Sequence, residues 1–149
     1  MAGVSSVRCP HCRRTNRVPA VAPGRPKCGN CHQLLPWIVT AGDQDFADIA
    51  GKVDVFVLID LWATWCRPCQ MVSPALERLA TEFAGRIKLV KVDVDSSPAV
   101  AARFEVRAVP TLLVMRGGDV VARQAGAPPM SELRHWLTSA IGADTAASV

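Results

Sequence analysis

Hydrophobic and polar positions divide the chain into two parts near residue 36. Residues 1–35, the leader, show neither helical nor strand periodicity, and prolines and glycines interrupt them repeatedly. Beyond the leader, apolar runs alternate with segments of helical spacing. The near-continuous apolar run Val55–Leu61 is typical of a strand that is buried on both faces of a sheet. The apolar face of the helix predicted after it consists of Val72, Leu76, Leu79 and Phe83.

The second part of the chain has the predicted element order β-α-β-α-β-α-β-β-α. The remaining elements are expected at residues 37–39, 46–49, 87–94, 98–104, 111–115, 120–122 and 131–141. Ser97 is predicted to cap the helix that Pro98 opens, Gly117 and Gly118 predict a hairpin turn, and Gly142 is predicted to end the last helix. Because strand–helix–strand units imply right-handed crossovers between parallel strands, we predict an α/β fold with a central mixed sheet flanked by helices.

Charge is distributed unevenly along the chain, which has 149 residues and a formal net charge of +4. Residues 1–42 contain six basic residues and no acidic residue, whereas the remainder contains 11 basic and 13 acidic residues. Length and this asymmetry indicate a domain with a small appendage. The change in pattern at residue 36 and the helix end predicted at Gly142 set the expected bounds: a small module at residues 1–35, a main domain at residues 36–142 and a flexible tail at residues 143–149.

The sequence shows no pattern typical of a targeting or membrane-spanning segment. Residues 1–7 lack the basic and apolar regions of a secretory signal. The run Val55–Leu61 contains Asp60 and is far too short to cross a bilayer. We therefore expect a soluble, cytoplasmic protein without a membrane partner.

Six cysteines form three Cys-x-x-Cys pairs, and in the cytoplasm such pairs favour metal or redox chemistry over structural disulfides. The first two pairs are Cys9/Cys12 and Cys28/Cys31. They are separated by 15 residues, a spacing typical of a zinc ribbon, and four thiolates suit one closed structural Zn²⁺ site. The leader cannot build an apolar core, so we expect the metal to order it. His11 and His32 adjoin the ligands and are expected to be bystanders.

The third pair, Cys66 and Cys69, is predicted to lie where the buried strand ends and the helix begins. A helix N-terminus favours the nucleophilic thiolate form of cysteine. In such a turn we expect the first sulfur to face solvent and the second to lie behind it. Cys66 is thus predicted to attack a substrate disulfide and Cys69 to resolve the mixed disulfide. A third metal site is the alternative, but the further ligands it would need are found nearby only in the leader.

The segment Phe56–Cys69, FVLIDLWATWCRPC, resembles the active-site stretch of the thioredoxin family. Val109-Pro110-Thr111 resembles the cis-proline loop of that family, and Gly126 stands where the family has a glycine in its substrate groove. The resemblance covers residues 36–142 and implies a thioredoxin fold. It also implies a protein-disulfide reductase that serves electron transport and cell redox homeostasis.

The resemblance implies a proton-handling pair beside the cysteines. Asp60 matches the family's buried acid, which helps to deprotonate the resolving thiol, and Lys91 matches the partner of that acid on the next strand. Because burial disfavours the charged form of a carboxyl, we expect the pKa of Asp60 to rise. The alternative for Asp60 is a strand-end acid that backbone donors satisfy.

The resemblance also implies a substrate-binding surface. Pro110 is expected to be cis, which would place the backbone of Val109 beside Cys66 to pair with an extended substrate. The residues expected to contact substrate are Trp65, Arg67, Pro68, Val109, Pro110 and Gly126.

Arg67 departs from the family pattern, which usually has glycine at this position. A cation beside Cys66 would stabilise the thiolate and hence the reduced form, which makes a protein less reducing. A disulfide oxidant or isomerase tuned by Arg67 is therefore a second candidate function. A solvated Arg67 with little effect is the alternative interpretation. Ala108 also replaces a common glycine, with little expected consequence.

A cysteine-paired leader before such a domain resembles the zinc-containing bacterial subtype of the family. This resemblance implies one Zn²⁺, structural or redox-sensitive, on the four leader cysteines and no bound organic cofactor. The implied partners are protein disulfides and an NADPH-dependent thioredoxin reductase. A zinc-dependent binding or holdase module is the alternative without enzymatic activity. Nucleic-acid binding is disfavoured, because no aromatic residues interleave the basic residues to stack on bases.

Overall fold

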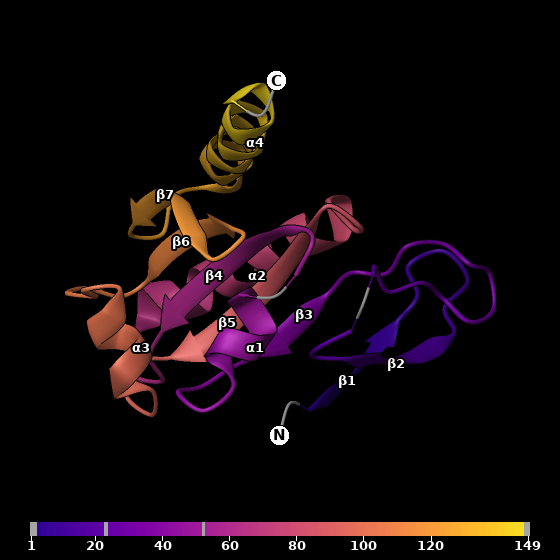
Figure 1. Ribbon diagram of the computed structural model, residues 1–149, viewed down its shortest axis with the longest axis horizontal. Coiled ribbons are helices and arrows are strands. Elements are labelled where there is room, and N and C mark those ends of the chain that lie inside the picture. Colours follow the sequence, from indigo (N-terminus) through magenta and orange to yellow (C-terminus); the bar gives the residue numbers. More distant parts are fainter. Residues whose placement is uncertain (1–2, 23, 52, 148–149) are drawn as a thin grey trace.

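A mixed five-stranded sheet lies at the centre of the structure, a computed structural model that describes residues 3–22, 24–51 and 53–147. Its strands are β3 (Ile38–Thr40), β4 (Phe56–Trp62), β5 (Ile87–Asp93), β6 (Thr111–Arg116) and β7 (Asp119–Ala125), in the spatial order β3-β5-β4-β6-β7 (Figure 1). Strand β5 pairs in parallel with β3 and β4, whereas β6 pairs antiparallel with β4 and β7. The predicted parallel crossovers and antiparallel edge are confirmed.

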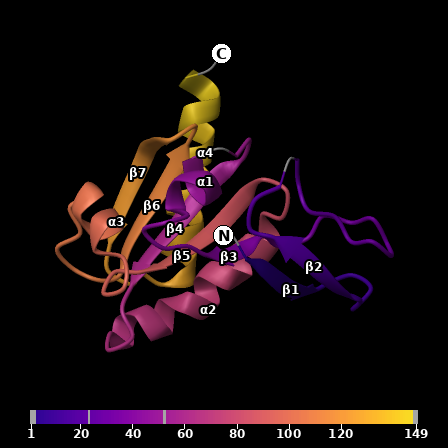
Figure 2. The same ribbon diagram turned by 60° about the horizontal axis from the view of Figure 1, so that its bottom comes forward.

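Helices cover both faces of this sheet (Figure 2). Helices α1 (Phe46–Gly51) and α3 (Pro98–Arg103) pack on one face, and α2 (Arg67–Glu82) and α4 (Met130–Ala147) pack on the other. Alternate residues of β4 face the two layers: Val57, Ile59 and Leu61 belong to the first core, and Phe56 and Leu58 to the second. This double burial explains the continuous apolar run in the sequence. No helix in the described part of the chain is long and apolar enough to cross a membrane.

Two helix ends differ from the sequence-based expectation. Ser97 makes no capping hydrogen bond with its side chain. Instead, the carboxylate of Asp43 accepts hydrogen bonds from the N–H groups of Ala99 and Val100 at 3.0 and 2.9 Å. Helix α4 continues past Gly142, so most of the predicted tail is helical. The residues beyond Gly142 are rich in alanine, and a single glycine costs a helix only about 1 kcal/mol.

The leader contains an antiparallel hairpin that the sequence pattern does not predict. Its strands are β1 (Val4–Arg8) and β2 (Thr15–Pro19), paired along their whole length. Most of their residues alternate only between exposed and half-buried, and Val18 is the one fully buried position in the two strands. The hairpin therefore lacks the apolar alternation by which a half-buried strand is found in a sequence.

The leader packs against the main domain beside β3 (Figure 1, Figure 2). Lys88 of β5 is fully buried at this contact, and its ammonium donates to the carbonyl oxygens of Ala20 in the leader and Ile49 in α1. The ammonium also lies 4.1 Å from the ring centroid of Trp37, whose Nε1 donates to the Pro19 carbonyl oxygen at 3.0 Å. Because a buried charge is costly unless it is well bonded, these contacts tie the leader to a defined place on the domain. The leader residues that join the domain's first core are Cys9, Val18, Ala20, Cys28 and Leu35.

Candidate functional site

The third cysteine pair lies at the junction of β4 and α2, as predicted. Cys66 is the N-cap residue of α2 with an extended backbone (φ −89°, ψ 109°). Pro68 occupies the first turn, where its missing N–H would have no partner within the helix. The backbone N–H of Cys69 donates to Cys66 Sγ at 3.1 Å. The helix therefore directs a donor at the Cys66 sulfur, an arrangement that favours its thiolate in the reduced form.

Cys66 and Cys69 form a disulfide, so the structure represents the oxidised form. The prediction that Cys66 faces solvent is wrong for this form, since both residues are only 3% exposed. The loop before β6 covers Cys66, whose Sγ lies 3.6 Å from the carbonyl oxygen of Val109. The two cysteines differ instead in their surroundings, because Cys69 lines a cavity that contains Asp60.

The residues around the disulfide differ in exposure: Trp65 and Gly126 are exposed, Val109 is half-buried and Pro110 is buried. Trp65 is 69% exposed, and its Nε1 donates to the carboxylate of Asp95 at 2.9 Å. The Val109–Pro110 peptide bond is cis. The N–H of Gly126 donates to the Pro110 carbonyl oxygen at 2.9 Å. The cis-proline loop thus brings Val109, Pro110 and Gly126 together on the side of the disulfide where Cys66 lies.

The first turn of α2 adds exposed residues beside the disulfide. Arg67 and Pro68 are exposed, and none of the contacts found among the described residues ties the charge of Arg67 to Cys66. Met71, four residues after Arg67 on α2, is 72% exposed and is an exposed apolar side chain that the predicted site does not include. The sequence does contain a signal for this exposure. Met71 lies outside the apolar face of the helix, which begins at Val72, so its side chain is expected to point to solvent.

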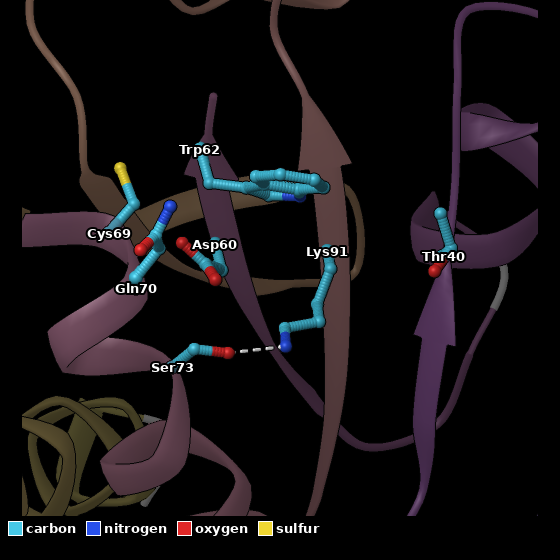
Figure 3. A pocket seen from close by; sticks show the side chains of 7 residues that line it. All are labelled: Thr40, Asp60, Trp62, Cys69, Gln70, Ser73 and Lys91. Carbon is cyan, nitrogen blue, oxygen red and sulfur yellow. Dashed lines mark hydrogen bonds between the residues drawn. The ribbon is translucent and has the colours of Figure 1, made fainter. Parts of the chain in front are cut away.

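Asp60 and Cys69 line one cavity behind the disulfide (Figure 3). The cavity has a volume of about 320 Å³ and is lined by Thr40, Asp60, Trp62, Cys69, Gln70, Ser73 and Lys91. Asp60 is 1% exposed, and its Oδ1 has no hydrogen-bond partner among the described residues, so the alternative of an acid satisfied by backbone donors is wrong. Burial raises the pKa of Asp60 to about 6, while the charge of Lys91 lowers it and that of Glu77 raises it. The predicted rise is therefore present, and burial is its main cause.

Lys91 is the direct neighbour of Asp60 across the β4–β5 pair, but its ammonium is bonded elsewhere. Lys91 Nζ donates to Ser73 Oγ at 2.6 Å and lies 3.9 Å from Glu77 Oε2. Asp60 forms no ion pair within 4.0 Å with any residue in the described ranges. The structure thus places the predicted pair in one cavity, adds Ser73 to its lining and brings Glu77 near the Lys91 ammonium. Neither residue is identified by the sequence pattern, because the only signal that marks Ser73 and Glu77 is their spacing of about one helical turn along α2.

The four leader cysteines converge on one point. Their Sγ atoms all lie within 4.8 Å of one another, and two of the distances, Cys9–Cys31 and Cys12–Cys28, are 3.5 Å. A tetrahedral site with Zn–S bonds of about 2.3 Å has S–S edges of about 3.8 Å, so the cluster has the size that a metal ion requires. The cysteines come from two turns, one after β1 and one after β2, as the paired spacing predicts.

Hydrogen bonds and the crowding of the sulfurs shift the pKa values of two leader cysteines in opposite directions. The backbone N–H of Cys31 is the largest of several hydrogen bonds that lower the pKa of Cys28 to about 5. The N–H of Gln33 lowers the pKa of Cys31, but burial and the neighbouring thiols together raise it to about 12. A bound cation would remove this conflict, because it stabilises all four thiolates at once. His11 and His32 are exposed and lie outside the group of metal-binding atoms.

Comparison with known proteins finds relatives that match the main domain. A family model described as Thioredoxin matches residues 37–139. The chain is 43% identical over 104 residues to a thioredoxin of Haemophilus influenzae, a match that covers 70% of this chain and 97% of that protein. It is 39% identical over 132 residues to thioredoxin C-3 of Corynebacterium nephridii, and this match covers 87% of this chain and 90% of that protein. The chain therefore belongs to the thioredoxin family and is a thiol–disulfide oxidoreductase.

Proposed function

We propose that this protein reduces disulfide bonds of other proteins through the dithiol of Cys66 and Cys69. The observation that carries the proposal is the Cys66–Cys69 disulfide at the N-terminus of α2, with Val109 against Cys66 and the Asp60 cavity against Cys69. Helix and loop geometry thus give the two sulfurs different neighbours, which supports different roles for them.

The reaction begins when the Cys66 thiolate attacks one sulfur of the substrate disulfide. A mixed disulfide forms, and the first substrate thiolate leaves. The Cys69 thiolate then attacks Cys66 Sγ, so that the Cys66–Cys69 disulfide forms and the second substrate thiolate leaves. Two electrons pass from the dithiol to the substrate sulfurs, and each released thiolate takes up a proton according to its own pKa.

Asp60 accepts the proton of Cys69 in this scheme. Both side chains line the same cavity, and a carboxyl with a pKa of about 6 is ionised at neutral pH yet binds a proton more readily than an ordinary carboxyl. Lys91 on the neighbouring strand offsets the negative charge of Asp60. Asp60 is therefore the general base of the resolving step.

The substrate lies on the surface around the disulfide. The cis-proline loop presents the Val109 backbone, which supports pairing with an extended polypeptide strand. Trp65 supplies exposed apolar area next to Cys66. The residues assigned to substrate binding are Trp65, Arg67, Pro68, Val109, Pro110 and Gly126.

Cys66→Ser and Cys69→Ser variants test this division of roles on a disulfide-bonded protein such as insulin. Cys66→Ser is expected to lose all turnover, whereas Cys69→Ser is expected to accumulate a covalent mixed disulfide because the resolving thiol is missing. Cys12→Ser, which removes a thiol from the leader, is the matched control and is expected to form no mixed disulfide. A Cys66→Ser variant that retains turnover would refute the assignment.

We also propose, from family membership, an NADPH-dependent thioredoxin reductase as the electron donor and the cytoplasm as the site of action. A coupled assay that follows NADPH oxidation with such a reductase and insulin measures this step. Substrate-dependent NADPH oxidation is the expected result, and a disulfide that the reductase does not reduce would contradict the proposed donor.

The leader, residues 1–35, is proposed to be a zinc module that marks the zinc-containing subtype of the family. Cys9, Cys12, Cys28 and Cys31 would hold one Zn²⁺, which would supply the charge and cross-linking that a segment without its own core needs. The match to thioredoxin C-3 covers 87% of the chain. Residues 36–149 make up a smaller share than that, so the match extends into the leader. Zinc content by mass spectrometry under native conditions is expected to show one ion per chain, and none in Cys28→Ser. Loss of that ion on peroxide treatment would distinguish a redox-sensitive site from a structural one.

A further inference from the structure

Ser73 lies one helical turn after Cys69 on α2, and its side chain points into the cavity that contains Asp60 (Figure 3). Its hydroxyl oxygen accepts a hydrogen bond from Lys91 Nζ at 2.6 Å, which is short for a bond of this kind. Glu77, one turn further along α2, lies 3.9 Å from the same ammonium. Helix α2 therefore holds Lys91 at two successive turns.

Because the ammonium of Lys91 is bonded to Ser73, Asp60 does not pair with its neighbour on the adjacent strand. Asp60 and Lys91 are register neighbours on β4 and β5, and side chains on one face of adjacent strands start only about 4.8 Å apart. Attraction between opposite charges is strong in a buried site, so a carboxylate and an ammonium so placed would be expected to form an ion pair. Instead, the ammonium bonds to Ser73, and Asp60 Oδ1 has no hydrogen-bond partner among the described residues.

The charged and titratable groups that face Asp60 come from two elements. Strand β5 contributes Lys91, and helix α2 contributes Glu77 and Cys69. The neighbour on β6 is the apolar Leu112, and the other cavity side chains are uncharged. After burial, the charge of Lys91 has the largest effect on the pKa of Asp60, so the position of its ammonium matters for that pKa.

We propose that Ser73 is a positioning residue, whose hydroxyl holds the Lys91 ammonium on the α2 side of the cavity and so preserves the affinity of Asp60 for a proton. The inference rests on the proposed role of Asp60 as proton acceptor from Cys69. Removal of the hydroxyl frees the ammonium to approach Asp60. An opposite charge within about 4–6 Å lowers the pKa of a carboxyl by about 1–3, so Asp60 becomes a weaker base in that variant.

The test is a titration of the Asp60 carboxyl by ¹³C NMR in the oxidised protein, with the signal assigned by its absence in Asp60→Asn. In Ser73→Ala the pKa of Asp60 is expected to fall by about one, a roughly tenfold weaker proton affinity. Ser73→Thr retains a hydroxyl and is expected to restore the wild-type value. In a Lys91→Met background, Ser73→Ala is expected to cause no shift, because the charge that Ser73 positions is absent.

Two results would overturn the inference. One is an unchanged pKa in Ser73→Ala, which would follow if the released ammonium moved to Glu77 or stayed in place. The other is an equal fall in the Lys91→Met background, which would show a structural effect of the substitution. The proposed function is tested separately by the rate of the resolving step in Asp60→Asn. If that rate is unchanged, Asp60 is not the proton acceptor, while the NMR shift still decides the role of Ser73.

Discussion

Replacement of Asp60 by asparagine tests how much stability the protein gives up to keep a carboxyl at this site. Asp60 is 1% exposed, and its Oδ1 has no hydrogen-bond partner among the described residues. Asparagine has nearly the same shape but carries no charge. The substitution therefore removes the cost of burying a carboxylate while it preserves the packing around the cavity.

The magnitude follows from the pKa of the carboxyl. Burial raises it from the ordinary value of 3.8 to about 6, and each tenfold change in proton affinity corresponds to about 1.36 kcal/mol. Ionisation of Asp60 therefore lowers the free energy of unfolding by about 3 kcal/mol at neutral pH. Because the folded-state pKa is raised, this cost is absent below pH 3.8, develops between pH 3.8 and 6, and is constant above pH 6. Asp60→Asn is expected to show no such loss.

Urea denaturation between pH 4.5 and 8 measures the free energy of unfolding of the wild type and of Asp60→Asn. The variant's free energy of unfolding minus that of the wild type is expected to be roughly 2 kcal/mol larger at pH 8 than at pH 4.5. Any cost of a buried amide is independent of pH, and the leader is identical in the two proteins, so neither contributes to the pH-dependent part. Asp54→Asn, at an exposed carboxyl, controls for the loss of one negative charge. A difference that does not change with pH would refute the argument that burial penalises the Asp60 carboxylate.

Two further substitutions test how the leader is held on the domain. Lys88→Met keeps most of the side-chain volume but leaves two buried carbonyl oxygens without their donor, and is expected to lower the free energy of unfolding by about 2–4 kcal/mol. Lys27→Met at an exposed lysine is its control, expected to change stability by less than about 0.5 kcal/mol, and equal effects would refute the role of Lys88. Gly85 has φ +84°, and a Cβ there would lie 2.5 Å from Leu34 Cδ1 in the leader, so Gly85→Ala is expected to destabilise by about 1–3 kcal/mol. Gly142 lies in α4 with open space around it, so Gly142→Ala is expected to stabilise the protein by about 0.5–1 kcal/mol. Thermal denaturation measures both glycine variants, and a change in stability of the same sign in both would contradict this reasoning.

The sequence predicts the element order of the main domain correctly because each signal is local. An apolar run that is buried on both faces, such as β4, and a helix with one apolar face, such as α2, leave periodic patterns within a few residues. The hairpin of the leader has no such pattern, because few of its side chains are buried. Its place in the structure comes from contacts with the domain, such as those of Lys88 and Trp37, which a local period does not encode.

The spacing of the cysteines is a property of the sequence, and with the predicted strand-to-helix position of Cys66 and Cys69 it predicts one four-cysteine cluster and one redox pair. The tertiary structure alone decides which contacts the side chains around the leader and the disulfide make. Lys88 is tied to the leader, Lys91 is bonded to Ser73 rather than to Asp60, and Cys66 is covered by the loop at Val109. Each of these contacts joins residues far apart in the chain, and its energy depends on burial, so only the packed fold specifies it.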